Sequence, residues 1–454
     1  MRNILVIGSG KSTSYLIKYL LDKSDSENLY ITVGDLKVDK AEKLINNHKN
    51  ATAITLDVFN KKSRVEAVKL ADIVISMLPA RYHVEVAKDC ITYNKSMVTA
   101  SYVSDDMQAL DQQAKAKGLV FMNEIGVDPG IDHMSAMQVI DRIEAKGGTL
   151  ILFESFTGGL VAPESDTNLW NYKFTWNPRN VVVAGQGSAA KFLQEGAFKY
   201  IPYNRLFRRT EFLEVEGFGR FEAYANRDSL KYQSIYGLDK VKTLYRGTIR
   251  RVGFCRAWNM FVALGMTDDS YTIDDSQNMS YRDFVNSFLP YSPTDSVEIK
   301  FRHALKIDQD DSVWEKLEEL DLFNATKMVN LDKATPAQIL QKILMDSWSL
   351  NPTDKDMIVM YHKFGYFLDG KKHQIDATMV TLGEDQTYTA MAKTVGLPVA
   401  MAAIAILNKK ISTPGVLRPI NSEVYIPILK ELQDYGIVFK EKKVPYLGYN
   451  PLHV

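Results

Sequence analysis

Short apolar segments alternate with amphipathic helical segments over the first 122 residues, and this alternation restricts the fold more than any other feature of the sequence. We expect strands at 3–8, 29–33, 51–56, 71–77, 96–100 and 119–122, with helices near 15–20, 39–45, 84–91 and 107–115. Strands that alternate with helices of this length form βαβ units, in which helices cover both faces of a parallel sheet. The sequence therefore predicts an α/β domain at the N-terminus.

A glycine-rich turn follows the first of these strands. The segment GSGKST at 8–13 matches G-x-G-x-x-G at Gly8 and Gly10, and Thr13 stands in the place of the third glycine. Such a turn lets the pyrophosphate of a dinucleotide approach the N-terminus of the following helix. A Walker A loop would need a glycine where Leu5 stands. We therefore predict a Rossmann-type dinucleotide-binding sheet.

An acidic residue follows the second expected strand. Asp35 can accept hydrogen bonds from both hydroxyls of an adenosine ribose, and its charge would repel a 2′-phosphate. This residue favours NAD over NADP, although Lys37 is close enough to complicate the argument. Asp57, after the third strand, is either a neighbour of the adenine or a helix cap.

The stretch NEIGVDPGIDH at 123–133 ends the alternation. Pro129 biases Asp128 towards an extended backbone, and Gly130 can let the backbone approach a ligand closely. Asp132 can cap the helix that follows. The stretch is either a turn that joins two domains or the wall of a site where a cofactor meets a substrate.

The rest of the chain predicts a second α/β domain and a helical insertion. Strands are expected at 149–155, 356–364 and 371–382, and helices at 313–320, 336–348, 388–409 and 425–435. We assign 1–130 to a dinucleotide-binding domain and 271–349 to an all-helical insertion.

Composition excludes several classes of protein. Lys+Arg and Asp+Glu are equal at 55 each, so the basic excess of a nucleic-acid-binding protein is absent. The two cysteines lie far apart and predict no disulfide framework and no metal site, which suits the cytoplasm. The apolar start is too short for a signal peptide, and the run from Val395 to Leu407 is too short to span a membrane.

The chain resembles the saccharopine dehydrogenase family, in particular its L-glutamate-forming members, over nearly its whole length. The segments that carry the resemblance are GSG at 8–10, LDV at 56–58, VTASYVS at 98–104, MNEIGVDPGIDH at 122–133, GGLVAPES at 158–165, YKF at 172–174, NRDS at 226–229, RGTIR at 246–250 and YHKF at 361–364. The resemblance implies the oxidation of saccharopine by a nicotinamide cofactor and water to glutamate and 2-aminoadipate 6-semialdehyde, and the reverse reaction. It also suggests a homodimer, a dinucleotide-binding domain 1–130 that is completed by about 385–454, and a substrate-binding α/β domain at 131–270 and 350–384.

The resemblance implies the following site residues. Substrate would contact Ser101, Tyr102, Asp128, Arg227, Thr248, Ile249 and Arg250. The cofactor would contact Gly8, Ser9, Gly10, Lys11, Ser12, Asp35, Asp57, Val58, Met77, Ala100, Ser101, Asp128, Pro129 and Gly130. Asp128, Tyr102 and Lys173 are the candidates for catalysis. His133 is an alternative proton carrier or a structural residue, and Thr157 stands where relatives can carry cysteine.

Two other functions stay open at this point. A related imine reductase would act on a polyamine-type substrate such as a precursor of carboxynorspermidine or homospermidine, but cationic substrates favour acidic pockets and the expected site has Arg227 and Arg250. A scaffold that binds a nucleotide without turnover would not need the SYVS, DPGIDH and NRDS segments. Family members that use NADP carry arginine after the second strand, so Asp35 again predicts NAD, with NADP as the alternative.

Overall fold

The computed structural model describes residues 1–448, and contacts between residues divide it into two compact units. The first unit contains Met1–Gly148 and Met379–Lys440, and the second contains Thr149–Thr378 and the residues from Glu441 onwards. Residues 449–454, part of the expected completion by 385–454, lie outside the described residues. The functional labels given to the domains stay predictions.

The first unit is built on a seven-stranded parallel sheet. Its order is β15-β6-β5-β4-β1-β2-β3. The order from β3 to β6 is that of a Rossmann fold, and β15 adds a strand from the C-terminal segment. The strands are β1 (Arg2–Ile7), β2 (Leu29–Asp35), β3 (Ala51–Thr55), β4 (Ile73–Ser76), β5 (Ser96–Val98), β6 (Val120–Met122) and β15 (Gly415–Leu417). The predicted α/β class is confirmed.

Helices cover both faces of this sheet. They are α1 (Ser14–Asp22), α2 (Val38–Ile45), α3 (Lys61–Leu70), α4 (His83–Thr92), α5 (Asp105–Gln108), α6 (Asp111–Ala116), α7 (Ile131–Glu144), α16 (Ala390–Leu407) and α17 (Ser422–Leu432). The sequence analysis did not predict α3. Its buried side chains are those of Arg64 and Val68, and Arg64 Nε donates to Asp89 at 2.6 Å. A charged residue on the inner face hides the helical pattern of apolar residues.

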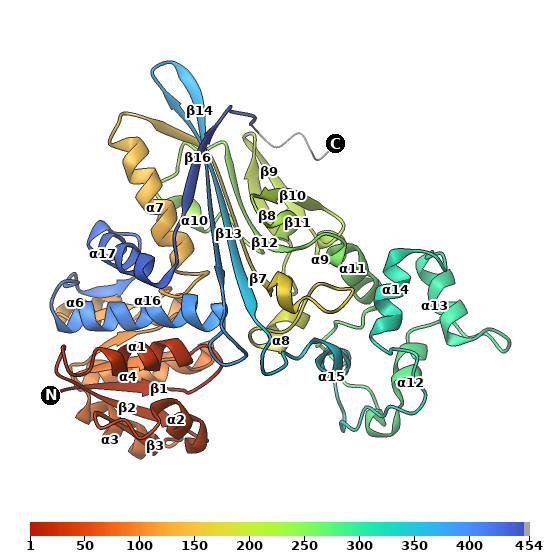
Figure 1. Cartoon of the computed structure of the whole chain (residues 1–454), viewed down its shortest axis with the longest axis horizontal. Coiled ribbons are helices and arrows are strands. Elements are labelled where there is room, and N and C mark those ends of the chain that lie inside the picture. Colours follow the sequence, from red (N-terminus) through yellow and green to blue (C-terminus); the bar gives the residue numbers. More distant parts are fainter. Residues whose placement is uncertain (449–454) are drawn as a thin grey trace. The chain divides into compact units, whose positions relative to one another are not determined.

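Helix α16 lies along α1 (Figure 1). A Cβ at Gly396 would lie 2.8 Å from the backbone nitrogen of Leu16, so only glycine allows this approach. Among residues 1–448, α16 is the one helix long and apolar enough to cross a membrane, which corrects the expectation that the apolar run is too short. However, 67% of the relevant window is buried inside the structure, as in a core helix.

The second unit is built on a nine-stranded mixed sheet in the order β10-β11-β12-β7-β13-β14-β16, with β8 beside β12 and β9 beside β8. The strands expected at 356–364 and 371–382 are β13 and β14, which are neighbours in the sheet, and the strand expected at 149–155 extends to Val161. The strands are β7 (Thr149–Val161), β8 (Ala190–Gln194), β9 (Ala197–Ile201), β10 (Thr210–Val215), β11 (Gly219–Ala225), β12 (Thr243–Arg251), β13 (Asp356–Leu368), β14 (Lys371–Leu382) and β16 (Lys440–Val444).

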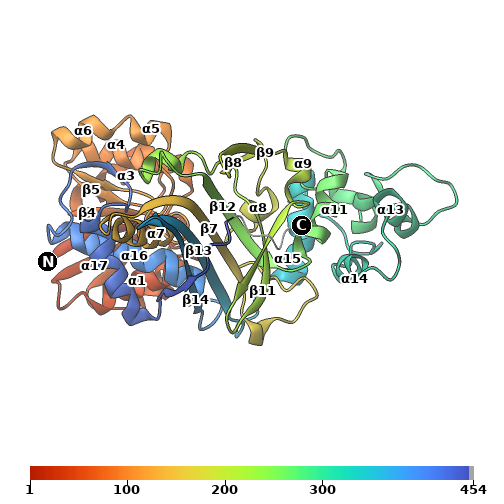
Figure 2. The same ribbon diagram turned by 90° about the horizontal axis from the view of Figure 1, so that it is seen from above.

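The helices of the second unit are mostly grouped outside the sheet, as Figure 2 shows for α11, α13 and α14. They are α8 (Pro178–Val182), α9 (Tyr203–Leu206), α10 (Tyr232–Ile235), α11 (Phe254–Leu264), α12 (Tyr281–Asn286), α13 (Val297–Leu305), α14 (Ser312–Glu319) and α15 (Pro336–Trp348). Buried aromatic rings join several of them: Trp170 contacts Trp348 at 5.1 Å and Phe261 at 5.8 Å between ring centroids. Helical structure at 271–349 was predicted.

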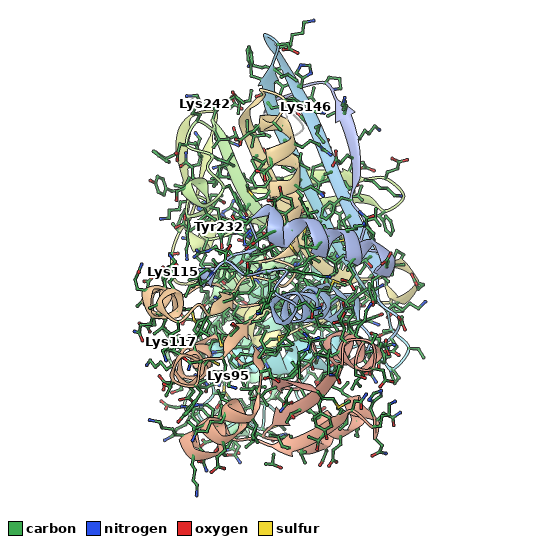
Figure 3. The ribbon with its side chains drawn as sticks, turned by 90° about the vertical axis from the view of Figure 1, so that its left-hand side faces the viewer. Lys95, Lys115, Lys117, Lys146, Tyr232 and Lys242 are labelled. Carbon is green, nitrogen blue, oxygen red and sulfur yellow. The ribbon has the colours of Figure 1, made fainter. Side chains whose placement is uncertain are left out.

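Three lysines gather on one face of the first unit: Lys95, Lys115 and Lys117 (Figure 3). Lys115 pairs with Asp111 at 2.7 Å, and Lys117 Nζ donates to the carbonyl of Ile91 at 2.7 Å. Two of the three cations are therefore engaged within the chain, and we assign no anion site to them. Both cysteines are free and buried. Residues 1–448 contain no group of three or more acidic, His or Cys side chains that could hold a metal ion.

Candidate nucleotide and amino-acid sites

The glycine turn lies at the carboxyl end of β1. Gly8 has φ 105°, and a Cβ there would lie 2.9 Å from the carbonyl oxygen of Met77 at the end of β4. A Cβ at Gly10 would meet nothing within 4 Å, so the backbone there faces open space. Thr13 closes the turn from inside, because its hydroxyl donates to the carbonyl of Gly10 at 2.7 Å. The turn thus leaves the room that a pyrophosphate needs.

Asp35 ends β2 and is bonded to this turn. Its Oδ2 accepts from the backbone nitrogen and the hydroxyl of Ser9, each at 2.7 Å, and its Oδ1 accepts from the backbone nitrogen of Lys37 at 2.9 Å. Burial raises the pKa of Asp35, but these hydrogen bonds outweigh burial and hold the pKa below its usual range. The carboxylate is therefore charged at neutral pH. Its Oδ1 keeps capacity for a further donor such as a ribose hydroxyl.

Five other predicted cofactor contacts lie around this edge of the sheet. Asp57 Oδ1 accepts from the backbone nitrogen of Phe59 at 2.9 Å, so it closes the turn before α3. Val58, Met77 and Ser12 are half-buried, and Lys11 is exposed. Burial and the nearby charge of Lys40 lower the pKa of Lys11. Asp57 is not the N-cap of α3, because Asn60 caps this helix by accepting from the backbone nitrogens of Lys62 and Ser63; its contact with the adenine stays a prediction.

Tyr102 and Asp128, both predicted to act in catalysis, lie together in the first unit. The Tyr102 hydroxyl donates to Asp128 Oδ1 at 3.3 Å, and 48% of Tyr102 is exposed. Tyr102 follows β5, and Asp128 follows β6, so the two neighbouring strands place them at the same edge of the sheet. Ala100 and Ser101 are half-buried beside them in the chain. A carboxylate and a phenol in contact can exchange protons with a ligand.

The loop at 126–130 is tightly closed. The Asp128–Pro129 peptide bond is cis, and the carbonyl of Pro129 accepts from the backbone nitrogen of Gly126 at 2.8 Å. A Cβ at Gly130 would overlap the carbonyl of Gly126, at 2.1 Å. Glycine is therefore required at position 130 because the backbone packs against Gly126 of the same loop, whereas the sequence predicted that it lets the backbone approach a ligand. Gly130 also precedes α7, and Asp132 Oδ1 accepts from its backbone nitrogen at 2.6 Å, so Asp132 is not the N-cap residue.

A buried ionic cluster supports this loop, and sequence reasoning missed two of its members. Glu124 is completely buried; its Oε1 accepts from Arg418 Nε at 2.9 Å and from the backbone nitrogen of Val103 at 3.0 Å. Its Oε2 lies 2.9 Å from His133 Nε2. His133 thus belongs to the internal support. No sequence motif connects Arg418 to Glu124, because the two are far apart in the chain.

The predicted substrate residues of the second unit occupy β11 and β12. Arg227 is exposed just beyond β11, and no ion pair of its side chain occurs among residues 1–448. The hydroxyl of Thr248 donates to Asn226 Oδ1 at 2.8 Å. Thr248 also faces Thr157 across the β12–β7 pair, and the Thr157 hydroxyl is buried without a hydrogen bond. These polar groups can receive a carboxylate.

Arg250 has a different environment from the one expected. Only 4% of it is exposed, and its guanidinium lies 4.9 Å from the ring of Tyr172 and 5.3 Å from that of Phe254. One nitrogen donates to the carbonyl of Ile249 at 2.8 Å, while Nε is buried without a partner. Arg250 is therefore an internal cation held by aromatic rings. Ile249 is fully buried.

Lys173 is engaged in an ion pair. Its Nζ donates to Asp354 Oδ2 at 2.7 Å, and only 2% of Lys173 is exposed. Burial raises the pKa of Asp354, but the hydrogen bond from Lys173 outweighs it and holds the pKa below its usual value. The catalytic role of Lys173 stays a prediction; in this structure its amine forms a buried ion pair with Asp354.

The strand order, the open glycine turn and the acidic residue after β2 define a Rossmann-type dinucleotide-binding protein with a second, mixed-sheet unit. Two family models match the chain: the saccharopine dehydrogenase NADP binding domain at residues 4–122 and the saccharopine dehydrogenase C-terminal domain at 126–437. The chain belongs to the saccharopine dehydrogenase family, and its cofactor is a nicotinamide dinucleotide.

Individual relatives agree with this assignment. A saccharopine dehydrogenase [NADP(+), L-glutamate-forming] of Schizosaccharomyces pombe is 32% identical, and the match covers 97% of this chain and 99% of that protein. The apo structure of the L-glutamate-forming saccharopine dehydrogenase of Saccharomyces cerevisiae has a TM-score of 0.88 and 31% identity, covering 98% of this chain and 100% of the other. The alpha-aminoadipic semialdehyde synthase of Arabidopsis thaliana is 32% identical over 93% of this chain, which spans 41% of that longer protein.

Proposed function

We propose that this chain interconverts saccharopine with L-glutamate and 2-aminoadipate 6-semialdehyde. The observation that carries the proposal is the Tyr102–Asp128 contact at the edge of the Rossmann sheet, in a chain that matches L-glutamate-forming enzymes from end to end. In the oxidative direction, saccharopine, oxidised cofactor and water give glutamate, the semialdehyde, reduced cofactor and one proton.

Tyr102 and Asp128 would move the protons of this reaction. A bound nicotinamide ring supplies the acceptor for the hydride that leaves the carbon beside the secondary amine. Asp128 is proposed to take a proton from the attacking water and to return one to the departing amine. Tyr102 holds Oδ1 of Asp128 through its hydroxyl. The steps proposed here do not use Lys173, whose amine is paired with Asp354.

Arg227 is proposed to bind a carboxylate of the substrate. Saccharopine carries three carboxylates, and a guanidinium can bind one of them through two parallel hydrogen bonds. Thr248 and Asn226 lie next to this position in the sheet and can add neutral hydrogen bonds. Arg250 is buried, so it would act on the substrate through its charge, and its hydrogen bond to the carbonyl of Ile249 would hold the backbone of that residue in place.

We propose NAD as the preferred cofactor. The names of the matched domain and of the fungal relative specify NADP, but Asp35 places a negative charge after β2, where a 2′-phosphate would lie. Its anchoring to Ser9 and its lowered pKa keep that charge in place at neutral pH. A homodimer and a cytoplasmic location also stay proposals, and they rest on the resemblance and on the composition of the chain.

The test is the absorbance of the nicotinamide ring when the purified protein receives saccharopine with NAD or with NADP. Turnover of saccharopine supports the proposal. Carboxynorspermidine and homospermidine serve as competing substrates, and turnover of these alone would assign the polyamine reaction. Cofactor binding without turnover of any of the three would leave the scaffold function. No observation in the structure favours either alternative, since Arg227 suits an anionic substrate.

A further inference from the structure

A buried chain of hydrogen bonds runs behind Ser101. His83 Nε2 lies 2.7 Å from the Ser101 hydroxyl, and His83 Nδ1 lies 2.8 Å from the Ser76 hydroxyl. Only 3% of His83 and none of Ser76 is exposed. The sequence analysis assigned a role to Ser101 but none to the other two, because a single histidine at the start of a helix matches no motif.

The topology of the first unit brings these residues together. Ser76 is the last residue of β4, His83 is the first residue of α4, and Ser101 follows the adjacent parallel strand β5. All three therefore lie at the carboxyl edge of the sheet, which is where Rossmann proteins bind their ligands. Thr99 adds a weaker contact, with its hydroxyl 3.4 Å from His83 Nε2.

His83 is neutral in this environment. Burial lowers its pKa to about 4, because nothing charged compensates for the loss of water around an imidazolium. A neutral imidazole has one nitrogen that donates and one that accepts. Since both nitrogens are bonded to hydroxyls, the imidazole fixes the position of the Ser101 hydroxyl oxygen, and its tautomer decides whether Ser101 donates to Nε2 or accepts from it.

We propose that His83 is a positioning residue, which holds the Ser101 hydroxyl in the orientation that the nicotinamide cofactor and the amino-acid substrate require. The inference rests on the proposed function, because the contacts of Ser101 with ligands follow from the family resemblance. Ser76 in turn fixes the ring of His83. The three side chains act as one unit, and His83 itself touches neither ligand.

The experiment uses variants that remove one hydrogen bond at a time. The amide of asparagine reaches the position of Nδ1, so His83→Asn keeps the bond to Ser76 and loses the bond to Ser101. The longer glutamine reaches the position of Nε2, so His83→Gln does the reverse. Ser101→Ala and the double variant with His83→Asn complete a double-mutant cycle. Ser24→Ala removes a buried hydroxyl elsewhere in the same unit and is the control.

We expect His83→Asn and Ser101→Ala each to lower kcat/KM for saccharopine by about threefold to tenfold, the usual effect of one hydrogen bond. The double variant should be no slower than Ser101→Ala, and His83→Gln should lose less than His83→Asn. Additive losses in the cycle, or wild-type kcat/KM in a folded His83→Asn protein, would overturn the proposal. If His83→Asn does not fold, the cycle of Ser76→Ala with Ser101→Ala decides by the same criterion.

The outcome can be separated from that of the proposed function. If the wild-type protein binds a nicotinamide cofactor but does not oxidise saccharopine, the proposed substrate is wrong, and the same cycle is measured on the dissociation constant of NAD or NADP. Coupling between His83 and Ser101 in that constant supports the positioning role for the cofactor. Independent effects of the two substitutions on cofactor binding overturn it.

Discussion

At the scale of residues, the proposed preference for NAD depends on Asp35, which is bonded to Ser9. Replacing Asp35 with arginine exchanges a charge that repels a 2′-phosphate for one that binds it, and a charged hydrogen bond contributes about 1.5–3 kcal/mol. We expect the ratio of kcat/KM for NADP to that for NAD to rise at least about tenfold. Asp57→Asn, which alters a turn on the same edge, should leave the ratio unchanged. An unchanged ratio in Asp35→Arg would remove Asp35 from cofactor selection.

Within residues 1–448 the side chain of Arg227 has no carboxylate partner, so its removal tests substrate binding. Arg227→Ala should raise KM for saccharopine by about tenfold to a hundredfold, which corresponds to about 1.5–3 kcal/mol for a hydrogen bond to a charged group. Arg220→Ala, another cation of the second unit, is the control, because its guanidinium covers the Phe212 ring. If both variants show the same KM as the wild-type protein, Arg227 does not bind the substrate.

Some residue roles could be predicted from the sequence and others could not. The glycines of the turn and the pair Tyr102–Asp128 follow strands of one sheet, so local pattern and topology together place them. The surroundings of Lys173 could not be predicted, because its partner Asp354 is 181 residues away and only the fold reveals it. The aromatic surroundings of Arg250 could not be predicted either, because they come from separate segments.

At the scale of elements, two glycines have opposite roles: Gly10 lies in the turn before α1, and Gly396 lies within α16. Gly10→Ala meets open space and should leave the melting temperature nearly unchanged, but it should weaken cofactor binding, since the added methyl group occupies the ligand side of the turn. Gly396→Ala should lower stability by about 1–3 kcal/mol through overpacking against α1. Thermal unfolding measures the stability of each variant, and titration with NAD measures its cofactor binding. A destabilised Gly10→Ala protein, or a Gly396→Ala protein with unchanged stability, would contradict the assigned roles.

The cluster of Glu124, His133 and Arg418 connects the end of β6 with α7 and the segment after β15. Burial raises the pKa of Glu124, but the hydrogen bond from His133 and the charges of His133 and Arg418 lower it to about 2. A depressed carboxyl pKa stabilises the fold above its ordinary pKa, near 4.5, and this stabilisation is lost as the pH falls towards 2.

Glu124→Gln should therefore destabilise the protein at neutral pH by about 3–5 kcal/mol, since it leaves buried partners without a counter-charge. It should also reduce the loss of stability between pH 4.5 and 2. Chemical unfolding at several pH values measures both effects. Equal pH dependence in the wild-type and variant proteins would exclude the cluster as a source of acid sensitivity.

Element prediction succeeded where one face of an element is apolar. The order of strands and helices in the first unit, α15 and β14 follow from such patterns. Helix α3 was missed, because the buried face presents Arg64. The strands β8 to β10 were also not predicted. In β9 most side chains are exposed, so its sequence lacks the alternation of apolar and polar residues that marks a half-buried strand.

At the scale of the molecule, the first unit is formed by two separate parts of the sequence, with the second unit between them in the chain. Strand β15 pairs with β6, and α16 covers α1, so the dinucleotide-binding unit needs residues from both ends of the sequence. The sequence predicted this completion through the resemblance and not through any local pattern. Removing the residues from Met379 onwards should expose the apolar surface of α1 and abolish cofactor binding, which titration with NAD would measure.

The account as a whole depends on saccharopine being the substrate and NAD the preferred cofactor. The most direct measurement is the initial rate of nicotinamide reduction with saccharopine, taken side by side with NAD and with NADP. We predict that saccharopine is oxidised, that L-glutamate and 2-aminoadipate 6-semialdehyde are formed, and that kcat/KM is higher with NAD than with NADP. Binding of either cofactor without oxidation of saccharopine would contradict the proposed function, and faster turnover with NADP would contradict the role of Asp35.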